Sequence, residues 1–190
     1  MVLFSKGTYK NIIARIKTRG AEINGTYELV GCGLITNNTT TKEIVDELGL
    51  DESIIEDFVH HIANFKEAQI GPYDTSKYLM AIPDTRAATK HISEDCLESR
   101  RCVVMFPPEH CFQSIQFLIR EGRVDVVCFM RSCDAIKNLP YDVWLCSYLA
   151  DVFLHNLGRT GEILSDRHKI TMSFGSLHVY KEDLGGSDVL

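Results

Sequence analysis

The spacing of apolar residues near the start of the chain changes from a helical to an extended period. Residues 8–18 have the spacing of an amphipathic helix, and residues 28–35 have the composition of a strand. Gly31 and Gly33 interrupt that strand. Glycines inside a strand pattern indicate a bulge or a close backbone approach, so we expect one of these here.

Two further amphipathic helices follow this strand. Residues 39–41 offer threonine N-caps for a helix that closes at Gly49, and residues 51–65 form a second helix that begins with acidic side chains. The next segment, residues 66–95, is the least regular, because GPYD and IPDT have the composition of turns. We expect a loop there that lies over a site.

The C-terminal half has the clearest strand pattern. Residues 101–106 form a short strand, and residues 114–119 and 124–130 form a β-hairpin joined by a charged Arg-Glu-Gly-Arg turn. Residues 142–157 predict a core helix, and residues 170–180 a last strand. Because a hairpin excludes an all-parallel sheet, the chain is predicted to be a single α+β domain with a mixed, mainly antiparallel sheet flanked by helices.

Composition and charge narrow the function classes. The chain has 190 residues, of which 45% are hydrophobic and 24% charged, so it can bury one sizeable core. Its net charge is −6 without a basic run, which disfavours a nucleic-acid polymer as partner, although a few arginines can still hold one phosphate. No signal-peptide core and no apolar run of membrane-spanning length occur, so we expect a cytoplasmic protein without membrane contact.

Seven cysteines raise the question of a reactive thiol. They stand at positions 32, 96, 102, 111, 128, 133 and 146. Their number is odd and no His/Cys spacing suits zinc, so we expect free thiols in a reducing compartment and no metal site. Cys32, Cys102, Cys128 and Cys146 sit in apolar runs and are expected to be core residues.

One cysteine stands in a recognisable register. The segment CFQSIQFLIREGRVDVVCFMRSCDAIKNLPYD begins with Cys111, carries Gln116 and Phe117 on a strand, and continues to Arg131–Asp134. It resembles the core of the thymidylate synthases, in which a nucleophilic cysteine precedes a Gln-aromatic pair and an Arg-Ser-x-Asp sequence. The likeness is nearly continuous over residues 98–144 and faint before residue 98.

The likeness also implies a binding role for several polar residues. Arg131 and Ser132 would bind the nucleotide phosphate, Gln116 would line the substrate site, and Asp134 would help to orient a second substrate. A thiolate forms readily only beside positive charge, which Arg131 would supply.

Two shorter motifs extend the likeness. GSLHVY matches the family's His-x-Tyr, so His178 and Tyr180 would contact the sugar. ESRR matches the segment whose arginines reach the partner's phosphate, which implies that Arg100 and Arg101 act across a symmetric homodimer. In isolation these two arginines would be solvated surface residues.

Asp142 is the most informative position. dUMP methylases carry Asn here and the related dCMP hydroxymethylases carry Asp, whose carboxylate can accept from the cytosine amine. The resemblance therefore implies attack of Cys111 on C6 of dCMP. It also implies transfer of a one-carbon unit from 5,10-methylenetetrahydrofolate to C5, giving 5-hydroxymethyl-dCMP. Asp142 could instead cap the following helix.

The sequence also departs from the family. His61 of FVHHIANF aligns with the usual glutamate and could handle protons, although a helix-surface histidine is the default. Arg19 could be the family's mobile phosphate arginine, and Tyr73 a remnant of its aromatic contacts. The alternatives are a dUMP C5 methylase or hydroxymethylase, a nucleotide-binding relic without folate chemistry, or an enzyme with another electrophile. Ribose and deoxyribose are not distinguished.

Overall fold

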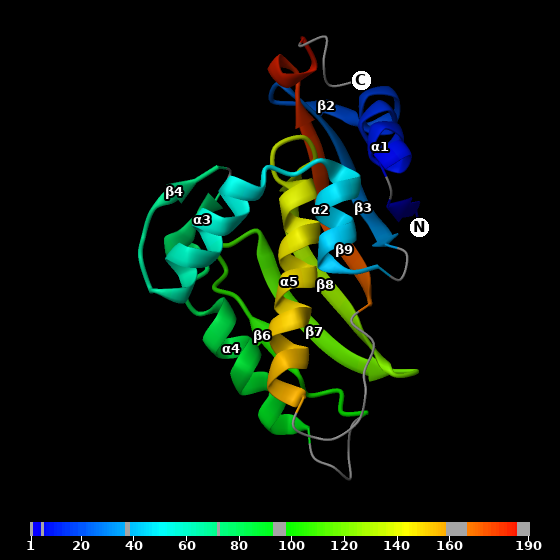
Figure 1. Ribbon diagram of the computed structural model, residues 1–190. Helices are drawn as coiled ribbons and strands as arrows, with labels where there is room; N and C mark the ends of the chain where they lie inside the picture. Colours follow the sequence, from blue (N-terminus) through cyan, green and yellow to red (C-terminus); the bar gives the residue numbers. More distant parts are fainter. Residues whose placement is uncertain are drawn as a thin grey trace.

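A computed structural model describes residues 2–4, 6–36, 39–71, 73–92, 98–158 and 167–185, with side chains described within residues 9–184 (Figure 1). The strands are β1 (Val2–Phe4), β2 (Ala21–Ile23), β3 (Thr26–Thr36), β4 (Gln69–Ile70), β5 (Tyr73–Asp74), β6 (Val103–Met105), β7 (Phe112–Arg120), β8 (Arg123–Asp134) and β9 (His168–Tyr180). The helices are α1 (Lys6–Arg19), α2 (Thr41–Leu48), α3 (Glu52–Ala63), α4 (Ala81–Ala88) and α5 (Leu139–Leu157), with 3-10 turns η1 (Thr75–Lys77), η2 (Thr89–His91) and η3 (Glu182–Gly185).

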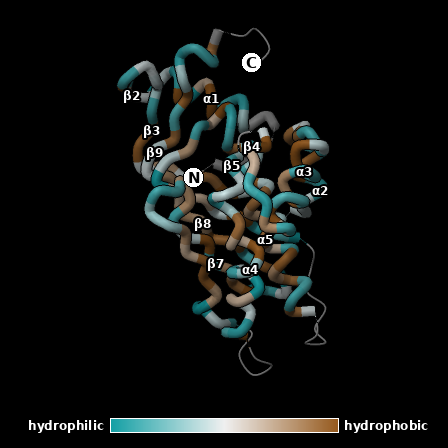
Figure 2. Tube along the Cα trace, turned by 90° about the vertical axis from the view of Figure 1, so that its left-hand side faces the viewer, coloured by the Kyte–Doolittle hydropathy of each residue, from teal (hydrophilic) through white to brown (hydrophobic). Residues whose placement is uncertain are grey.

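One mixed sheet organises the chain. Its strand order is β1-β3-β9-β8-β7-β6, and β2 pairs with β3, while β4 and β5 form a separate hairpin. The β1–β3 and β8–β9 pairs are parallel and the other pairs in the large sheet are antiparallel. The predicted α+β class with a mixed sheet is therefore confirmed. Figure 2 shows the helices gathered on one side of the sheet.

The predicted hairpin forms β7 and β8. Glu121 and Gly122 have φ values of 52° and 70°, which is the left-handed pair that a tight hairpin turn requires. Arg120 and Arg123 pair on either side of this turn. Both strands extend beyond the predicted ranges, and β8 reaches Asp134.

The helices α2 and α3 begin where cap chemistry places them. Thr40 accepts from the backbone of Glu43, whose side chain accepts in return from Thr40, and Gly49 closes α2 in the left-handed conformation. Asp51 caps α3 through the backbone N–H of Ser53. Both helices were predicted, α2 from its threonine N-caps and closing glycine, and α3 from its acidic start.

Helix α5 begins earlier than predicted. It starts at Leu139, with Asn138 as the preceding residue and Pro140 in its first turn, where a missing N–H is tolerated. Asp142 lies inside the helix, so the interpretation of Asp142 as an N-cap is wrong. Phe153 of α5 stacks on Phe117 of β7 with ring centroids 4.8 Å apart, which anchors the helix to the sheet. No helix in the described ranges is long and apolar enough to cross a bilayer.

The segment predicted to be irregular is largely ordered. IPDT lies within α4 rather than in a turn, because Pro83 occupies the first helical turn and removes no needed hydrogen bond. Of the GPYD stretch, Tyr73 and Asp74 form β5 and pair with β4, and Tyr73 is buried, while Pro72 lies outside the described ranges. Cys96 and the residues around it lie outside the described ranges.

The face of the sheet away from the helices carries two rows of uncharged side chains. The first row is Val103, Gln116, Val127, Thr171 and Ile35, and the second is Met105, Ser114, Phe129, Ser173 and Gly33. Met105 and Phe129 are 67% and 49% exposed. We call these two rows the open face. Large apolar side chains exposed together on one face usually mark an interface.

A line of irregular pairing crosses four strands at one level. The β7–β8 register shifts between Phe112 and Ser114. The regular pairing of β8 with β9 skips Arg131 and Gly175, and that of β3 with β9 skips Gly31 and Gly175. We call this level the kink line. The inward-facing positions move by one residue there, since Met130 and Cys133 of β8 are both buried, as are Phe174 and Leu177 of β9.

Glycine at the kink line is required by space and by conformation. Gly31 has φ of +63°, and a Cβ on Gly33 would lie 2.9 Å from the carbonyl oxygen of Met172. A Cβ on Gly175 would lie 2.6 Å from the carbonyl oxygen of Arg131. Of the two expectations for the strand glycines, the close approach is therefore confirmed at Gly33, whereas the register with β9 is the same on both sides of Gly31 and contains no bulge.

We expect Gly175→Ala to lower the free energy of unfolding by about 1–3 kcal/mol, because backbone must move to admit the methyl group. Urea unfolding of the purified variant measures this loss. Gly158→Ala is the matched control, since a Cβ there meets its nearest atoms at 3.6 Å. Equal stability of the two variants would contradict the close approach.

Candidate functional site

Cys111 lies where β7 begins, beside β8. Its side chain is partly buried and its Sγ is 3.6 Å from the Oγ of Ser132. Its carbonyl oxygen accepts from the backbone N–H of Arg131 at 2.9 Å. The structure thus brings three of the sequence-predicted residues together at the kink line.

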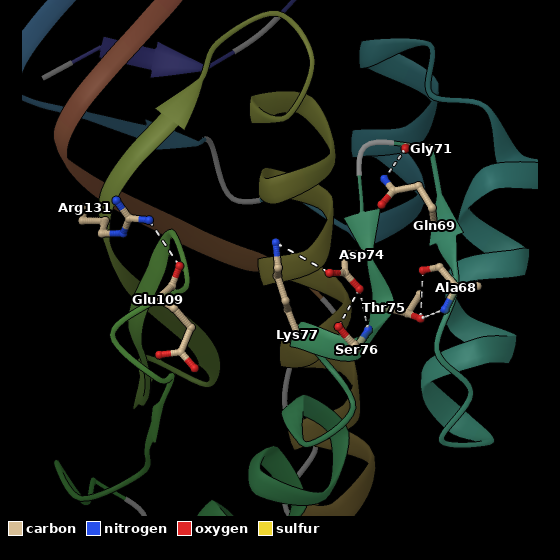
Figure 3. Close-up of polar contacts among 9 residues, drawn as sticks. All are labelled: Ala68, Gln69, Gly71, Asp74, Thr75, Ser76, Lys77, Glu109 and Arg131. Carbon is tan, nitrogen blue, oxygen red and sulfur yellow. Dashed lines mark hydrogen bonds and ion pairs between the residues drawn. The ribbon is translucent and has the colours of Figure 1, made fainter.

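The guanidinium of Arg131 lies against the loop that precedes Cys111. Its Nε donates to the carbonyl oxygen of His110 at 3.0 Å, and its Nη2 donates to that of Glu109 at 3.2 Å (Figure 3). The side chain is exposed, and its remaining N–H donors stay available to an anion. Arg131 therefore holds the Cys111 loop and still presents positive charge.

Ser132 and Asp134 run side by side with β9. In the parallel β8–β9 register Ser132 lies opposite Ser176, and Asp134 opposite His178. The carboxylate of Asp134 is buried and accepts from the backbone N–H groups of Ile136 and Lys137 at 2.9 and 3.1 Å. Its first role is to hold the turn between β8 and α5, which the sequence interpretation did not foresee.

His178 and Tyr180 lie together at the end of β9. Their rings are in edge-to-face contact with centroids 5.4 Å apart, and the Nζ of Lys137 lies 5.2 Å from the centroid of the Tyr180 ring. Tyr180 is 39% exposed. The pair is accessible and lies on the strand next to Ser132.

Asp142 is buried between α5, β5 and β8, and only 2% of it is exposed. The hydroxyl of Tyr73 donates to Oδ1 at 3.3 Å, and the thiol of Cys133 donates to Oδ2 at 3.4 Å. Burial raises the pKa of Asp142 to about 7, against the opposing effect of the hydrogen bonds from Cys133 and Tyr73. Near neutral pH this carboxyl therefore exists in both protonation states.

Tyr78 is a buried phenol whose ring centroid lies 5.4 Å from that of Tyr73, the partner of Asp142. Burial, and then the charges of Asp142 and Cys111, raise the pKa of the Tyr78 phenol well above its usual value. Burial, then the charge of Asp142 and, more weakly, that of Cys111 also raise the pKa of the Cys133 thiol. Tyr78 and Cys133 thus lie within electrostatic reach of both the nucleophile candidate and the carboxyl.

His110 is a buried imidazole beside this group. Its ring lies 6.0 Å from that of Tyr78 and 5.9 Å from that of Phe106 between centroids, and its Nδ1 has no hydrogen-bond partner among the described residues. Burial lowers the pKa of His110. The imidazole is therefore held neutral next to Cys111 in the chain.

Two predicted residues lie away from Cys111. Gln116 points to the open face, since its neighbours Ile115 and Phe117 are fully buried, and its Nε2 donates to the carbonyl oxygen of Arg100 at 2.8 Å. His61 lies on α3, where its Nδ1 is 2.7 Å from the carbonyl oxygen of Asp57. Neither joins the Cys111 group within this chain.

The other predicted arginines line separate cavities. Arg100 and Arg101 line one of about 600 Å³ beside the edge strand β6, near the end of β7 that is remote from Cys111. Arg19 and Arg15 of α1 line another of about 300 Å³ against β3, together with Cys32 and Leu177. The cavity reaches β9 at Leu177, which pairs with Cys133, so it lies one strand from the residue that follows Ser132.

Tyr78, Cys133 and His110 were missed by sequence reasoning, and Tyr73 was expected to touch a ligand rather than Asp142. Cys133 follows Arg131-Ser132 directly, and His110 precedes Cys111, so proximity to the motif was a usable signal for both. Tyr73 and Tyr78 approach Asp142 from 69 and 64 positions earlier in the chain. No local pattern predicts that approach.

Comparison with known proteins adds no family. No protein-family model matches the chain, and no curated protein matches it either. The geometry that bears on function is the contact of Cys111 with Ser132 and Arg131, and the separate contacts of Asp142 with Tyr73 and Cys133.

The raised pKa of Asp142 predicts a pH-dependent cost to stability. Between its usual pKa of 3.8 and its folded value of about 7, the unfolded chain releases the proton and the folded chain keeps it. Relative to Asp142→Asn, the wild type should lose about 1.4 kcal/mol per pH unit in this window, and the difference should be constant above it. Chemical unfolding at several pH values measures the difference. Asp46→Asn, at an exposed position, should show no such trend.

Proposed function

We propose that this protein modifies C5 of a pyrimidine nucleoside monophosphate, with dCMP as substrate and 5-hydroxymethyl-dCMP as product. The observation that carries the proposal is the contact between Cys111 and Ser132 beside the guanidinium of Arg131. The resemblance to thymidylate synthases and dCMP hydroxymethylases supplies the reaction class. A thymidylate synthase-like fold is part of the same proposal.

The phosphate end is formed by Arg131 and Ser132. A guanidinium binds phosphate oxygens through parallel N–H donors, and the hydroxyl adds one more donor. Arg131 is already fixed by the carbonyl oxygens of His110 and Glu109, so little side-chain entropy is lost when an anion arrives. The sugar would then extend along β9 toward His178 and Tyr180.

Cys111 is the proposed nucleophile. Its sulfur forms a bond to C6 of the ring, and the electron pair of the C5–C6 double bond moves to C5. C5 then bonds to a one-carbon electrophile at the oxidation level of formaldehyde and loses its proton. The C6–S bond breaks and returns the electron pair to sulfur, and water supplies the hydroxyl group of the product.

Asp142 is the proposed recognition group for the base. Its carboxyl is buried and is fixed by Tyr73 and Cys133. The charges of Asp142 and of Cys111 both act on the phenol of Tyr78. A carboxylate accepts from the exocyclic amine of cytosine, whereas uracil presents a carbonyl oxygen at that position. This favours cytosine.

The described residues around Asp142 do not fit a folate ring. Phe58, Tyr73, Tyr78 and Trp144 pack on one another, and each is at most 9% exposed, so none offers a free face for stacking. We therefore assign no residue to methylenetetrahydrofolate. This observation favours the second candidate, a nucleotide-binding protein without folate chemistry, which the exchange experiment below separates from an enzyme.

A homodimer joined through the open face is part of the proposal. Arg101 lies near the level of Leu118, seven residues along β7 from Cys111, which is about 20 Å at the rise of a strand. The open face is centred between these two levels. A twofold axis across the strands at this centre would carry the partner's Arg100 and Arg101 toward Cys111, as the proposed phosphate site requires.

The first experiment follows loss of the H5 signal of dCMP in D2O by NMR, without any one-carbon donor. The wild type should exchange H5 of dCMP faster than that of dUMP, and Cys111→Ser should slow exchange by roughly a thousandfold or more. Cys32→Ser, at another partly buried thiol, is the control. Faster exchange of dUMP would defeat the cytosine assignment, and binding of dCMP without exchange would defeat the enzyme.

The second experiment tests the dimer by sedimentation. Phe129→Asp places a charge in the centre of the open face and should convert the dimer to a monomer at micromolar concentration. It should also weaken dCMP binding, because the partner's arginines are lost. Phe65→Asp, at a residue 58% exposed on another surface, should leave the dimer intact. A monomeric wild type would refute the arrangement.

A further inference from the structure

The surroundings of Asp142 contain acids and neutral donors. The groups that face it or act on the same cluster are Tyr73, Tyr78, Cys111, Cys128, Cys133, Asp134 and Cys146. None of these can carry positive charge. A buried carboxylate is normally paired with a cation, and no such partner occurs for this carboxyl among the residues that the structure describes.

The two direct partners of Asp142 hold its geometry in either protonation state. The Tyr73 phenol donates to Oδ1 and the Cys133 thiol donates to Oδ2, so the plane of the carboxyl is set from β5 and from β8. Both donors are uncharged and weak compared with a guanidinium or ammonium. Each carboxyl oxygen keeps a further lone pair for a ligand.

The proton decides which group at position 4 of the ring fits this carboxyl. At that position cytosine presents an amine donor, and uracil presents the O4 acceptor. An uncharged carboxyl, which can donate or accept, can pair with either group. A carboxylate has acceptors only, so it still binds the cytosine amine but repels O4 of uracil.

We propose that Tyr73 and Cys133 are specificity-determining positioning residues, which hold Asp142 as a carboxyl with an exchangeable proton, so that discrimination between cytosine and uracil nucleotides increases with pH. This inference rests on the proposed function, because it assumes that Asp142 meets the base. Beyond the proposed function, pH would regulate the choice of substrate, and Tyr73 and Cys133 would set the pH at which this choice changes.

Variants that remove one of these donors and a variant that strengthens one should have opposite effects. Removing a donor from the carboxylate disfavours the charged state, so Tyr73→Phe and Cys133→Ala should move the onset of discrimination to higher pH. Cys133→Ser replaces a weak donor with a stronger one and should move it to lower pH. A merely structural role for Cys133 would not produce opposite signs for Ala and Ser.

The experiment is calorimetric titration of the full-length protein with dCMP and with dUMP from about pH 5 to about pH 8.5. The ratio of the two dissociation constants removes the titration of the phosphate, which both nucleotides share. In the wild type the ratio should increase about tenfold or more around pH 7, because burial raises the pKa of Asp142 to about 7. Tyr148→Phe, which removes the hydroxyl of another tyrosine, one that lies on α5 and stacks on Trp144, should leave the midpoint unchanged.

The outcomes separate this inference from the proposed function. If dCMP binds but the ratio is flat with pH, or does not move in Tyr73→Phe and the Cys133 variants, the inference fails and the proposed function stands. If both nucleotides bind no better than inorganic phosphate, both fail. An infrared band of an uncharged carboxyl at about pH 6 that Asp142→Asn lacks should accompany the expected result, and its absence in the wild type would also overturn the inference.

Discussion

The packing of α5 on the sheet is the constraint from which the site follows. Phe153 stacks on Phe117, and the apolar side of the helix is fully buried, so any polar residue on that side must find its partners within the protein. Asp142 is such a residue. It meets the phenol of Tyr73 and the thiol of Cys133 rather than a cation, and a carboxyl that would be an ordinary surface acid elsewhere becomes a group that titrates near neutrality.

The kink line determines which residues of β8 and β9 face the helices. An alternating strand would place Ser132 and Cys133 on fixed faces, but the irregular pairing at Arg131 and Gly175 moves the inward set by one residue. Cys133 thereby turns toward Asp142, while Ser132 remains beside Cys111. Without the irregular pairing, alternation from the buried Met130 would turn Ser132 inward and Cys133 outward, and Cys133 would not reach Asp142.

Sequence reasoning succeeded where the signal is local. The β7–β8 turn, the caps of α2, the acidic start of α3 and the close approach at a strand glycine depend on a few adjacent residues, and all were predicted. It failed at α4, where Pro83 was taken for a turn although the first helical turn accepts proline. Asp142 was identified, but its partner Tyr73 was not, because that contact depends on how a distant hairpin packs. His61 was expected near the site, yet α3 directs Phe58 and Ile62 inward instead.

The position of β9 has a consequence for how the chain is made. β9 lies between β3 and β8, so the strands at the two ends of the chain share one sheet only after residues 168–180 have emerged. At ribosomal rates the interval between Thr36 and His168 lasts on the order of ten seconds. Throughout that time the edge of β3 has no antiparallel neighbour except β2, and it is open to pairing with other nascent chains. Protection of this early edge during synthesis is therefore as much a requirement of the fold as the core that eventually covers it.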